Sequence, residues 1–209
     1  MKSSSAFSPG ILGLIIVLFL VPFALQAQDL QVTLDGFNAE RLRTNRTGMS
    51  VLGGWAIANI GFSGVQYFRT EGVTKGFHQM NVFWNIVNLG LAVPGFLGSA
   101  PGSADGLSIA ESVREQQKME KILLFNTGLD VGYVMAGFFL RERSRNSAVS
   151  NPDRMRGWGN SLILQGGFLF AFDLTLVLFH SAHGNKGIMK FLETVQVGPG
   201  TLGLNIPLN

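Results

Sequence analysis

The chain has 209 residues, which leaves room for one domain. Hydrophobic residues make up 46% of it and charged residues only 14%, well below the ~25% typical of soluble proteins, so in water it would expose large apolar patches. The net charge of +3 is small and its basic residues are scattered, so no nucleic-acid partner is expected. The absence of cysteine excludes disulfides and thiolate metal sites.

The N-terminal segment, residues 1–27, has the pattern of a signal peptide. Lys2 supplies a positive charge, residues 11–24 form a short apolar stretch, and the sequence LQA at 25–27 resembles a cleavage box. The mature chain would then begin at Gln28. The alternative is an uncleaved anchor helix, because leucine suits the cleavage box less well than alanine.

Four apolar runs follow, and each is long enough to cross a bilayer. A hydrocarbon core of about 30 Å needs about 20 helical residues. The runs cover residues 49–67, 77–97, 122–140 and 159–180, joined by polar segments. The sequence therefore predicts an all-α integral membrane four-helix bundle over residues 28–183, with lipid as its surroundings.

The connecting segments carry their own expectations. Residues 28–37 alternate weakly and predict an extended strand. Residues 98–107 have the composition of a loop, and Ser108 is suited to cap a helix that starts polar and continues into the third run. A basic loop is expected over 141–157. The tail, 184–209, begins amphipathic and ends extended, and it can pair as a strand with 28–37.

Loop charge predicts the orientation. A cleaved signal leaves the mature N-terminus outside the cytoplasm, and four spans return the C-terminus to the same side. The short loops 69–76 and 141–157 would then face the cytoplasm, and their dense basic residues agree with the positive-inside rule. The expected location is the inner membrane of a bacterial cell.

Polar residues within the four runs form stripes at helical spacing, so each helix has one polar face. These faces favour a bundle with a polar interior and apolar sides in lipid. The stripes are Asn59, Ser63 and Gln66; His78, Asn81, Asn85 and Asn88; Asn126, Asp130 and Tyr133; and Ser161, Gln165, Asp173 and His180.

Depth along the spans divides these residues into two layers. Asn88, Asp130 and Asp173 each lie about eight residues from the outer end of their span, so they should form one layer. No Lys or Arg occurs within the four runs, and a charged Asp at mid-membrane costs roughly 3 kcal/mol. Therefore at least one of the two acids is protonated, or the two share a cation, or an outer arginine, Arg43 or Arg46, reaches them.

The candidate site residues come from both layers. The outer layer supplies Asn88, Asp130 and Asp173, the inner set is His78, Asn81 and Gln165, and Asn126 and Tyr133 are added from the same face of the third run as Asp130. Three interpretations remain open. The site binds or conducts a proton, cation or small polar ligand, with His78 and Asn81 as an inner relay. Alternatively, the polar residues only hold the helices of an accessory subunit together.

The third interpretation is a membrane-embedded metalloenzyme with ligands among His180, Asp173, Asp130 and Asn88, although no HxxxH or ExxH pair fixes a geometry. No nucleophile elbow, phosphate loop or zincin motif occurs, so a non-enzyme is favoured over an enzyme and no cofactor is identified. His183 lies past the fourth span and is expected to be a solvated loop residue.

A row of small residues in the third run, Gly128, Gly132 and Ala136, lies opposite Asp130 on the helix. Small residues at this spacing let another helix approach closely. The row favours a homo-oligomer or a larger membrane complex.

Three segments carry a family resemblance: FHQMNVFWNIVNLGLA, KILLFNTGLDVGYVMAG and SLILQGGFLFAFD. Together they resemble a family of small bacterial membrane proteins of unknown function, with four helices after a signal peptide. The resemblance covers roughly residues 38–182. It implies a fold and a location, and no activity.

Overall fold

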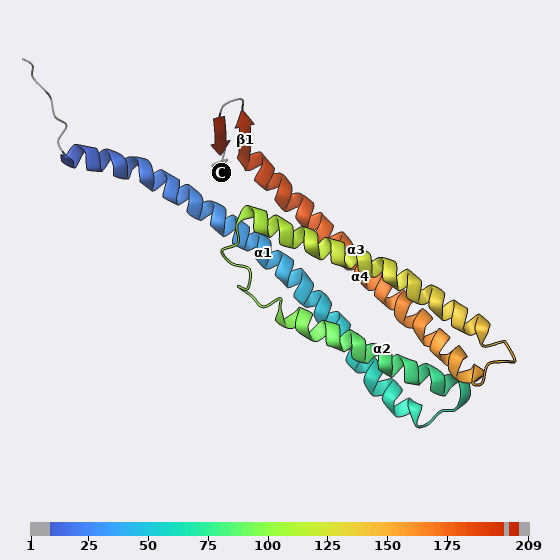
Figure 1. The fold of residues 1–209 in the computed structure, drawn as a ribbon. Coiled ribbons are helices and arrows are strands. Elements are labelled where there is room, and N and C mark those ends of the chain that lie inside the picture. Colours follow the sequence, from blue (N-terminus) through green and yellow to red (C-terminus); the bar gives the residue numbers. More distant parts are fainter. Residues whose placement is uncertain (1–8, 199–200, 205–209) are drawn as a thin grey trace, which may run out of the picture.

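The computed structural model describes the backbone of residues 9–198 and 201–204 and the side chains of residues 28–187. Four helices form an elongated bundle, and a short β-hairpin follows the last of them (Figure 1). The predicted all-α four-helix fold is confirmed. The elements are α1 (Pro9–Tyr67), α2 (Gly72–Leu97), α3 (Ile109–Arg143), α4 (Pro152–Thr194), β1 (Val195–Gly198) and β2 (Thr201–Leu204).

The bundle consists of two helical hairpins. α1 packs along α2 and α3 packs along α4, and the two hairpins are joined mainly through α2 and α4 (Figure 1). α1 touches α3 and α4 much less, and α2 and α3 hardly approach each other. The space between the hairpins is bordered by all four helices, so a cavity there is lined by side chains of both hairpins.

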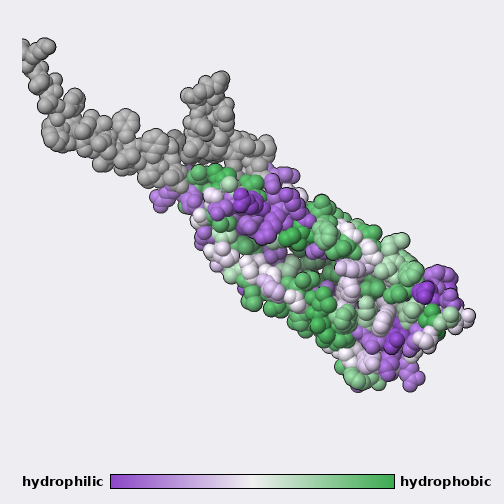
Figure 2. Space-filling view, in the orientation of Figure 1, coloured by the Kyte–Doolittle hydropathy of each residue, from purple (hydrophilic) through white to green (hydrophobic). Residues whose placement is uncertain are grey.

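Within the described residues, three helices are long and apolar enough to cross a membrane: α2, α3 and residues Pro152–Gly187 of α4. Their outer faces carry exposed phenylalanine, leucine and valine side chains. Figure 2 shows this apolar surface between hydrophilic ends, as expected of a chain that lies across a bilayer. Residues 49–67 of α1 are not among the three, and their crossing stays a prediction, although α1 runs alongside α2.

The strand expected at 28–37 is wrong, because these residues belong to α1. Leu30, Leu34 and Phe37 follow helical spacing and pack together with Ile109 of α3, and this contact outweighs the weak alternation of the segment. The tail does not pair with 28–37 either. β1 pairs antiparallel with β2, with Val195 opposite Leu204.

Residues 9–27 continue α1 toward the N-terminus, and residues 1–8 lie outside the described part of the chain. A signal peptide and an uncleaved anchor share a helical backbone here, so cleavage after Ala27 stays a prediction. The basic loop is shorter than the expected 141–157, because α3 extends to Arg143 and α4 begins at Pro152. The Asn151 Oδ1 atom accepts the Arg154 backbone N–H at 3.0 Å and satisfies the start of α4.

The predicted cap of α3 at Ser108 is confirmed. The Ser108 Oγ accepts the Glu111 backbone N–H at 3.3 Å, and the Glu111 carboxylate accepts the Ser108 backbone N–H at 2.9 Å, which completes a capping box. Ser108→Ala should lower the free energy of unfolding by about 1 kcal/mol, as measured by detergent-to-SDS unfolding. Ser103→Ala, in the exposed loop, is the matched control. Equal stability of the two variants would contradict a stabilising cap.

Glycines bring α4 against its two main neighbours. Gly137 of α3 faces Gly159 of α4, and a methyl group added to Gly137 would lie 2.7 Å from the Gly159 carbonyl oxygen. Gly76 of α2 faces the backbone of Arg154 at 2.9 Å from such a methyl group. These contacts hold α3 and α2 close against α4.

Candidate functional site

A cavity of about 390 Å³ lies in the outer half of the bundle, between the two hairpins. All four helices line it. Its polar lining consists of Asn45, Asn88, Asn126, Asp130, Tyr133 and Asp173, and the remaining lining is apolar or aromatic. The structure thus brings the three residues of the predicted outer layer, Asn88, Asp130 and Asp173, around one cavity together with the candidates Asn126 and Tyr133.

Asp130 and Asp173 lie on adjacent helices at this cavity. Their side chains are 2% and 6% exposed, and the two carboxyl groups are close enough to interact directly. Among the described residues no ion pair reaches either acid. Two neighbouring carboxylates away from water cannot both carry a charge cheaply, so the pair needs a proton, a cation or another hydrogen-bond donor.

Two buried polar atoms at the cavity wall also lack hydrogen-bond partners among the described residues. They are the Asp130 Oδ2 atom and the Trp84 indole Nε1. Both residues line the cavity. A buried acceptor and a buried donor left unpaired cost roughly 1–3 kcal/mol each, which is the cost a bound molecule would relieve.

Of the three alternatives for the acid pair, an outer arginine is not observed among the described residues. Arg43 points to solvent and pairs with Glu40 at 3.8 Å. Arg46 lies over the Phe96 ring at 3.8 Å and donates to the Phe96 carbonyl. Neither arginine forms an ion pair with Asp130 or Asp173, so the acid pair has no basic partner among the described residues.

The predicted inner set forms a separate network beneath the cavity. The Asn81 Nδ2 group donates to Asn59 Oδ1 and Ser63 Oγ, each at 2.8 Å, and the Asn81 Oδ1 atom accepts from Gln165 Nε2. Ser63 also contacts His78 Nδ1 at 3.1 Å. These buried side chains satisfy one another, as polar residues that join membrane helices do.

Two further residues complete this inner network. The Trp55 indole donates to Gln165 Oε1 at 2.9 Å while its ring stacks on Phe168. Asn85 donates to the Asn81 carbonyl at 2.8 Å, and Asn88 donates to Asn85 Oδ1 at 3.3 Å. Asn88 therefore connects the network to the cavity above it.

A third polar cluster lies outward of the cavity, and the sequence analysis missed it. The Arg41 Nη2 group donates to Asn38 Oδ1 at 3.1 Å, and Asn38 Nδ2 donates to Ser112 Oγ at 2.8 Å. Gln116 donates to the His180 carbonyl at 2.6 Å. Helical spacing carried the signal, because Asn38, Arg41 and Asn45 follow i, i+3 and i+7 on α1.

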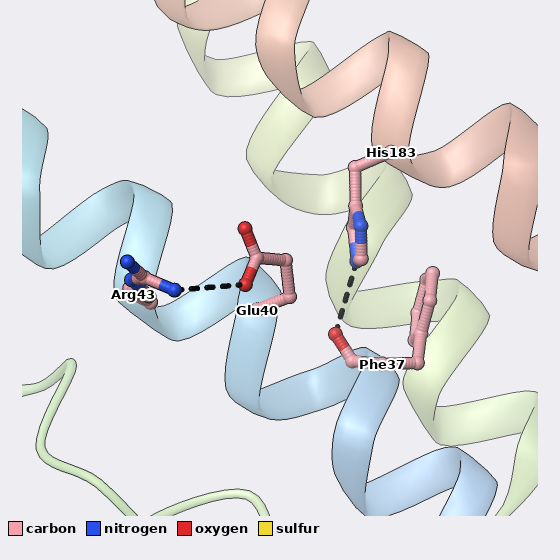
Figure 3. A network of polar contacts seen from close by, with 4 residues as sticks. All are labelled: Phe37, Glu40, Arg43 and His183. Carbon is pink, nitrogen blue, oxygen red and sulfur yellow. Dashed lines mark hydrogen bonds and ion pairs between the residues drawn. The ribbon is translucent and has the colours of Figure 1, made fainter.

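His183 is not a solvated loop residue, contrary to expectation. It belongs to α4, its ring stacks on Phe37 at 4.5 Å, and its Nε2 atom lies 3.0 Å from the Phe37 carbonyl oxygen (Figure 3). The Glu40–Arg43 pair lies beside this contact on α1 (Figure 3). α4 continues well beyond the predicted span, and this extension carries His183 onto α1.

The residues considered for a metal centre are not arranged as one. The described part of the chain has no group of three or more His, Cys, Asp or Glu side chains able to hold a metal ion. His180 is fully buried, and neither of its ring nitrogens has a partner. It belongs to the outward cluster with Gln116 rather than to the acid pair.

The small-residue row of α3 faces outward. A methyl group added at Gly128 or Gly132 would have nothing within 4 Å, and Ala136 is exposed. α3 instead packs on α4 through Gly137. The outward row leaves room for a second helix, and the homo-oligomer or larger complex stays a prediction.

A comparison with curated proteins and a comparison with solved structures each found no match. A family model does match, over residues 51–174, which contain the cavity's acid pair and the inner network. These residues lie within the region whose resemblance to a family of unknown function the sequence carries. The chain belongs to the family of unknown function DUF6992.

Proposed function

We propose that this membrane protein binds a small polar ligand or cation in the cavity between Asp130 and Asp173. The acid pair supports the proposal most strongly, because two buried carboxyl groups without a basic partner need a positive or proton-donating group between them. The unpaired Asp130 Oδ2 and Trp84 Nε1 atoms add one acceptor and one donor for the same ligand.

Binding is favoured over conduction by the inner network. A conducting route needs water or mobile protons on both sides of the site. On the inner side, Asn81, Ser63 and Gln165 are buried and bonded to one another. The amides of this layer donate and accept hydrogen bonds without releasing a proton at ordinary pH, so the titratable His78 is joined to the cavity only through groups that hold the helices rather than carry protons.

The second candidate is an accessory subunit in which polar residues only hold helices together. The inner network favours it, because its side chains are mutually bonded. The acid pair does not fit this role. Polar residues that join membrane helices bond to partners inside the bundle, whereas the Asp130 Oδ2 atom has no partner among the described residues.

We further propose that the protein lies in the bacterial inner membrane with its two short turns in the cytoplasm. The α1–α2 turn and the α3–α4 turn lie at the same end of the bundle (Figure 1). This end carries Arg69, Lys75, Arg141, Arg143, Arg145, Arg154 and Arg156. Basic residues in short loops favour the cytoplasmic side.

Methylammonium is a suitable probe of the acid pair, since it is a small cation with three N–H donors. Titration into the nanodisc-embedded protein should raise its melting temperature, and saturation at about 100 times the dissociation constant should add about 2.7 kcal/mol. Tetramethylammonium at the same ionic strength, which offers no N–H or O–H donor, should have a much smaller effect.

The matched variants are Asp130→Asn and Asp173→Asn. Asparagine keeps the shape and hydrogen-bonding capacity of a protonated Asp, so each variant should fold within about 1 kcal/mol of the wild type and lose the methylammonium shift. Retention of the full shift in the double variant would place the cation elsewhere. Absence of any shift in the wild type would favour the accessory subunit.

A further inference from the structure

The cavity has an opening on the face of the bundle that lies between α2 and α3. Its lining includes Val87 and Leu91 of α2 and Ile122 and Leu129 of α3, and these side chains are 39–60% exposed. α2 and α3 hardly approach each other along their lengths, so the four side chains border a window rather than a packed seam. Figure 2 shows the surface hollowed between the two hairpins, within its apolar middle section.

The window faces lipid rather than water. Its four residues lie within two of the helices that are long and apolar enough to span a membrane. A hydrocarbon core covers the middle of such helices. A molecule that uses this window therefore approaches from within the bilayer.

Side-chain contacts lie at both ends of the cavity. At the outer end, Asn45 Nδ2 donates to Ser99 Oγ at 2.6 Å, and both residues are buried. At the inner end the Trp84 and Tyr133 rings meet edge to face at 4.6 Å across the same α2–α3 gap. The Asn81 network lies beneath them. These contacts leave the lateral window as the open side between α2 and α3.

On the side of α1 and α4, the cavity is bordered by the ring of Phe172. A larger groove of about 650 Å³ lies between α1 and α4, and Phe172 lines both this groove and the cavity. Leu169 is buried beside it in the same core cluster. The Phe172 ring thus separates the cavity from the second lipid-facing surface.

The chemistry of the lining changes from window to interior. Valine, leucine and isoleucine side chains border the window, whereas Asp130, Asp173 and Asn88 lie at the buried side with the unpaired Trp84 Nε1. An apolar mouth with a polar floor matches a molecule that has an apolar chain and a small hydrogen-bonding head. A fully hydrated ion would have to lose its water in contact with lipid first.

We infer that the ligand of the acid pair is an amphipathic molecule dissolved in the membrane, which inserts a small N–H- or O–H-bearing head through the window between α2 and α3. The inference rests on the proposed binding function and specifies its ligand class. A cavity of about 390 Å³ holds a head group and the first part of a chain, and the rest of the chain remains among the lipids.

Two carbodiimides distinguish the lateral route from an aqueous one. Dicyclohexylcarbodiimide partitions into lipid, whereas a charged, water-soluble carbodiimide does not, and both modify protonated carboxyl groups. In each case the carboxyl proton moves to a carbodiimide nitrogen as its oxygen bonds to the central carbon. With the nanodisc-embedded protein, peptide mass spectrometry should show the lipid-soluble reagent on Asp130 or Asp173, and the water-soluble reagent on neither.

A bulky substitution at the window tests whether the lipid-soluble reagent enters there. Leu91→Trp should remove most of the labelling by the lipid-soluble reagent, because the larger ring fills the opening. Leu124→Trp, exposed on α3 outside the cavity lining, should leave labelling unchanged. Dodecylamine should protect the acids from the reagent at concentrations at which ethylamine protects them far less, since only the former carries a long chain and accumulates in the bilayer.

The outcomes separate the inference from the function on which it rests. Labelling by the water-soluble reagent, or equal protection by ethylamine, overturns the lateral route and leaves the cation site standing. Unchanged labelling in Leu91→Trp also overturns it. If neither reagent labels the acids until SDS unfolds the protein, the cavity is closed, and both the window and the binding function fail.

Discussion

Replacing Asn81 by alanine is expected to lower the free energy of unfolding by about 2–4 kcal/mol. Asn81 joins three helices, because it contacts Asn59 and Ser63 of α1 and Gln165 of α4 from its place on α2. Alanine cannot replace these bonds, so buried amide and hydroxyl groups would remain without partners. Each such group costs roughly 1–3 kcal/mol.

Unfolding from mild detergent into SDS, followed by circular dichroism, measures this loss. Asn185→Ala is the matched control, since Asn185 is exposed on the same bundle. The control should unfold at the wild-type SDS fraction. If Asn81→Ala unfolds there as well, the inner layer does not hold the helices together, and a hydrated inner route to the cavity becomes the better account.

The second large effect is expected at Gly157, where α4 crosses α2. A methyl group at this position would overlap the Val73 carbonyl oxygen and the Phe77 amide nitrogen and would lie 2.7 Å from the Gly76 carbonyl carbon. These are backbone atoms, so a rotamer change cannot relieve the overlap. Gly157→Ala should therefore cost at least the roughly 1–3 kcal/mol of an overpacked core, because the helices must separate.

Gly167 provides the control on the same helix. It is exposed, and a methyl group added there has nothing within 4 Å. Gly167→Ala should match or slightly exceed the wild-type stability, because alanine favours a helix over glycine by up to about 1 kcal/mol. Equal melting temperatures for the two variants in nanodiscs would show that α2 and α4 do not cross at Gly157.

Helical spacing and apolar length were sufficient to predict the four helices and the polar faces. His78, Asn81, Asn85 and Asn88 are all buried, as are Ser161, Gln165, Asp173 and His180. These predictions succeed because a helix in lipid must turn its polar side chains inward, and that requirement depends on the sequence alone. Counting turns from the span ends also brought Asn88, Asp130 and Asp173 to the same level of the bundle.

Helix ends and pairing partners were harder to predict. Residues 28–37 alternate weakly enough to suggest a strand, but Leu34 and Phe37 pack on α3 only once the whole bundle is assembled. The same packing brings His183 onto Phe37. Such contacts join residues far apart in the chain, so local periodicity carries no information about them.

The opening between α2 and α3 could not be predicted from the sequence. The spacing of Asn126, Asp130 and Tyr133 gives their common face on α3, whereas the gap depends on how the two hairpins dock. That docking is set by the backbone contacts between α2 and α4 at Gly76 and Gly157. Glycines in a sequence do not reveal which partner they will meet.

The most direct test of the binding site is an experimental high-resolution map of the protein, purified in nanodiscs from its native membrane and read in the cavity between Asp130 and Asp173. The account predicts density for a non-protein molecule, with its head within hydrogen-bonding distance of a carboxyl oxygen and its chain leaving between Leu91 and Ile122. A cavity without such density, with both carboxyl groups bonded to protein side chains, would contradict a binding function and leave a structural membrane subunit.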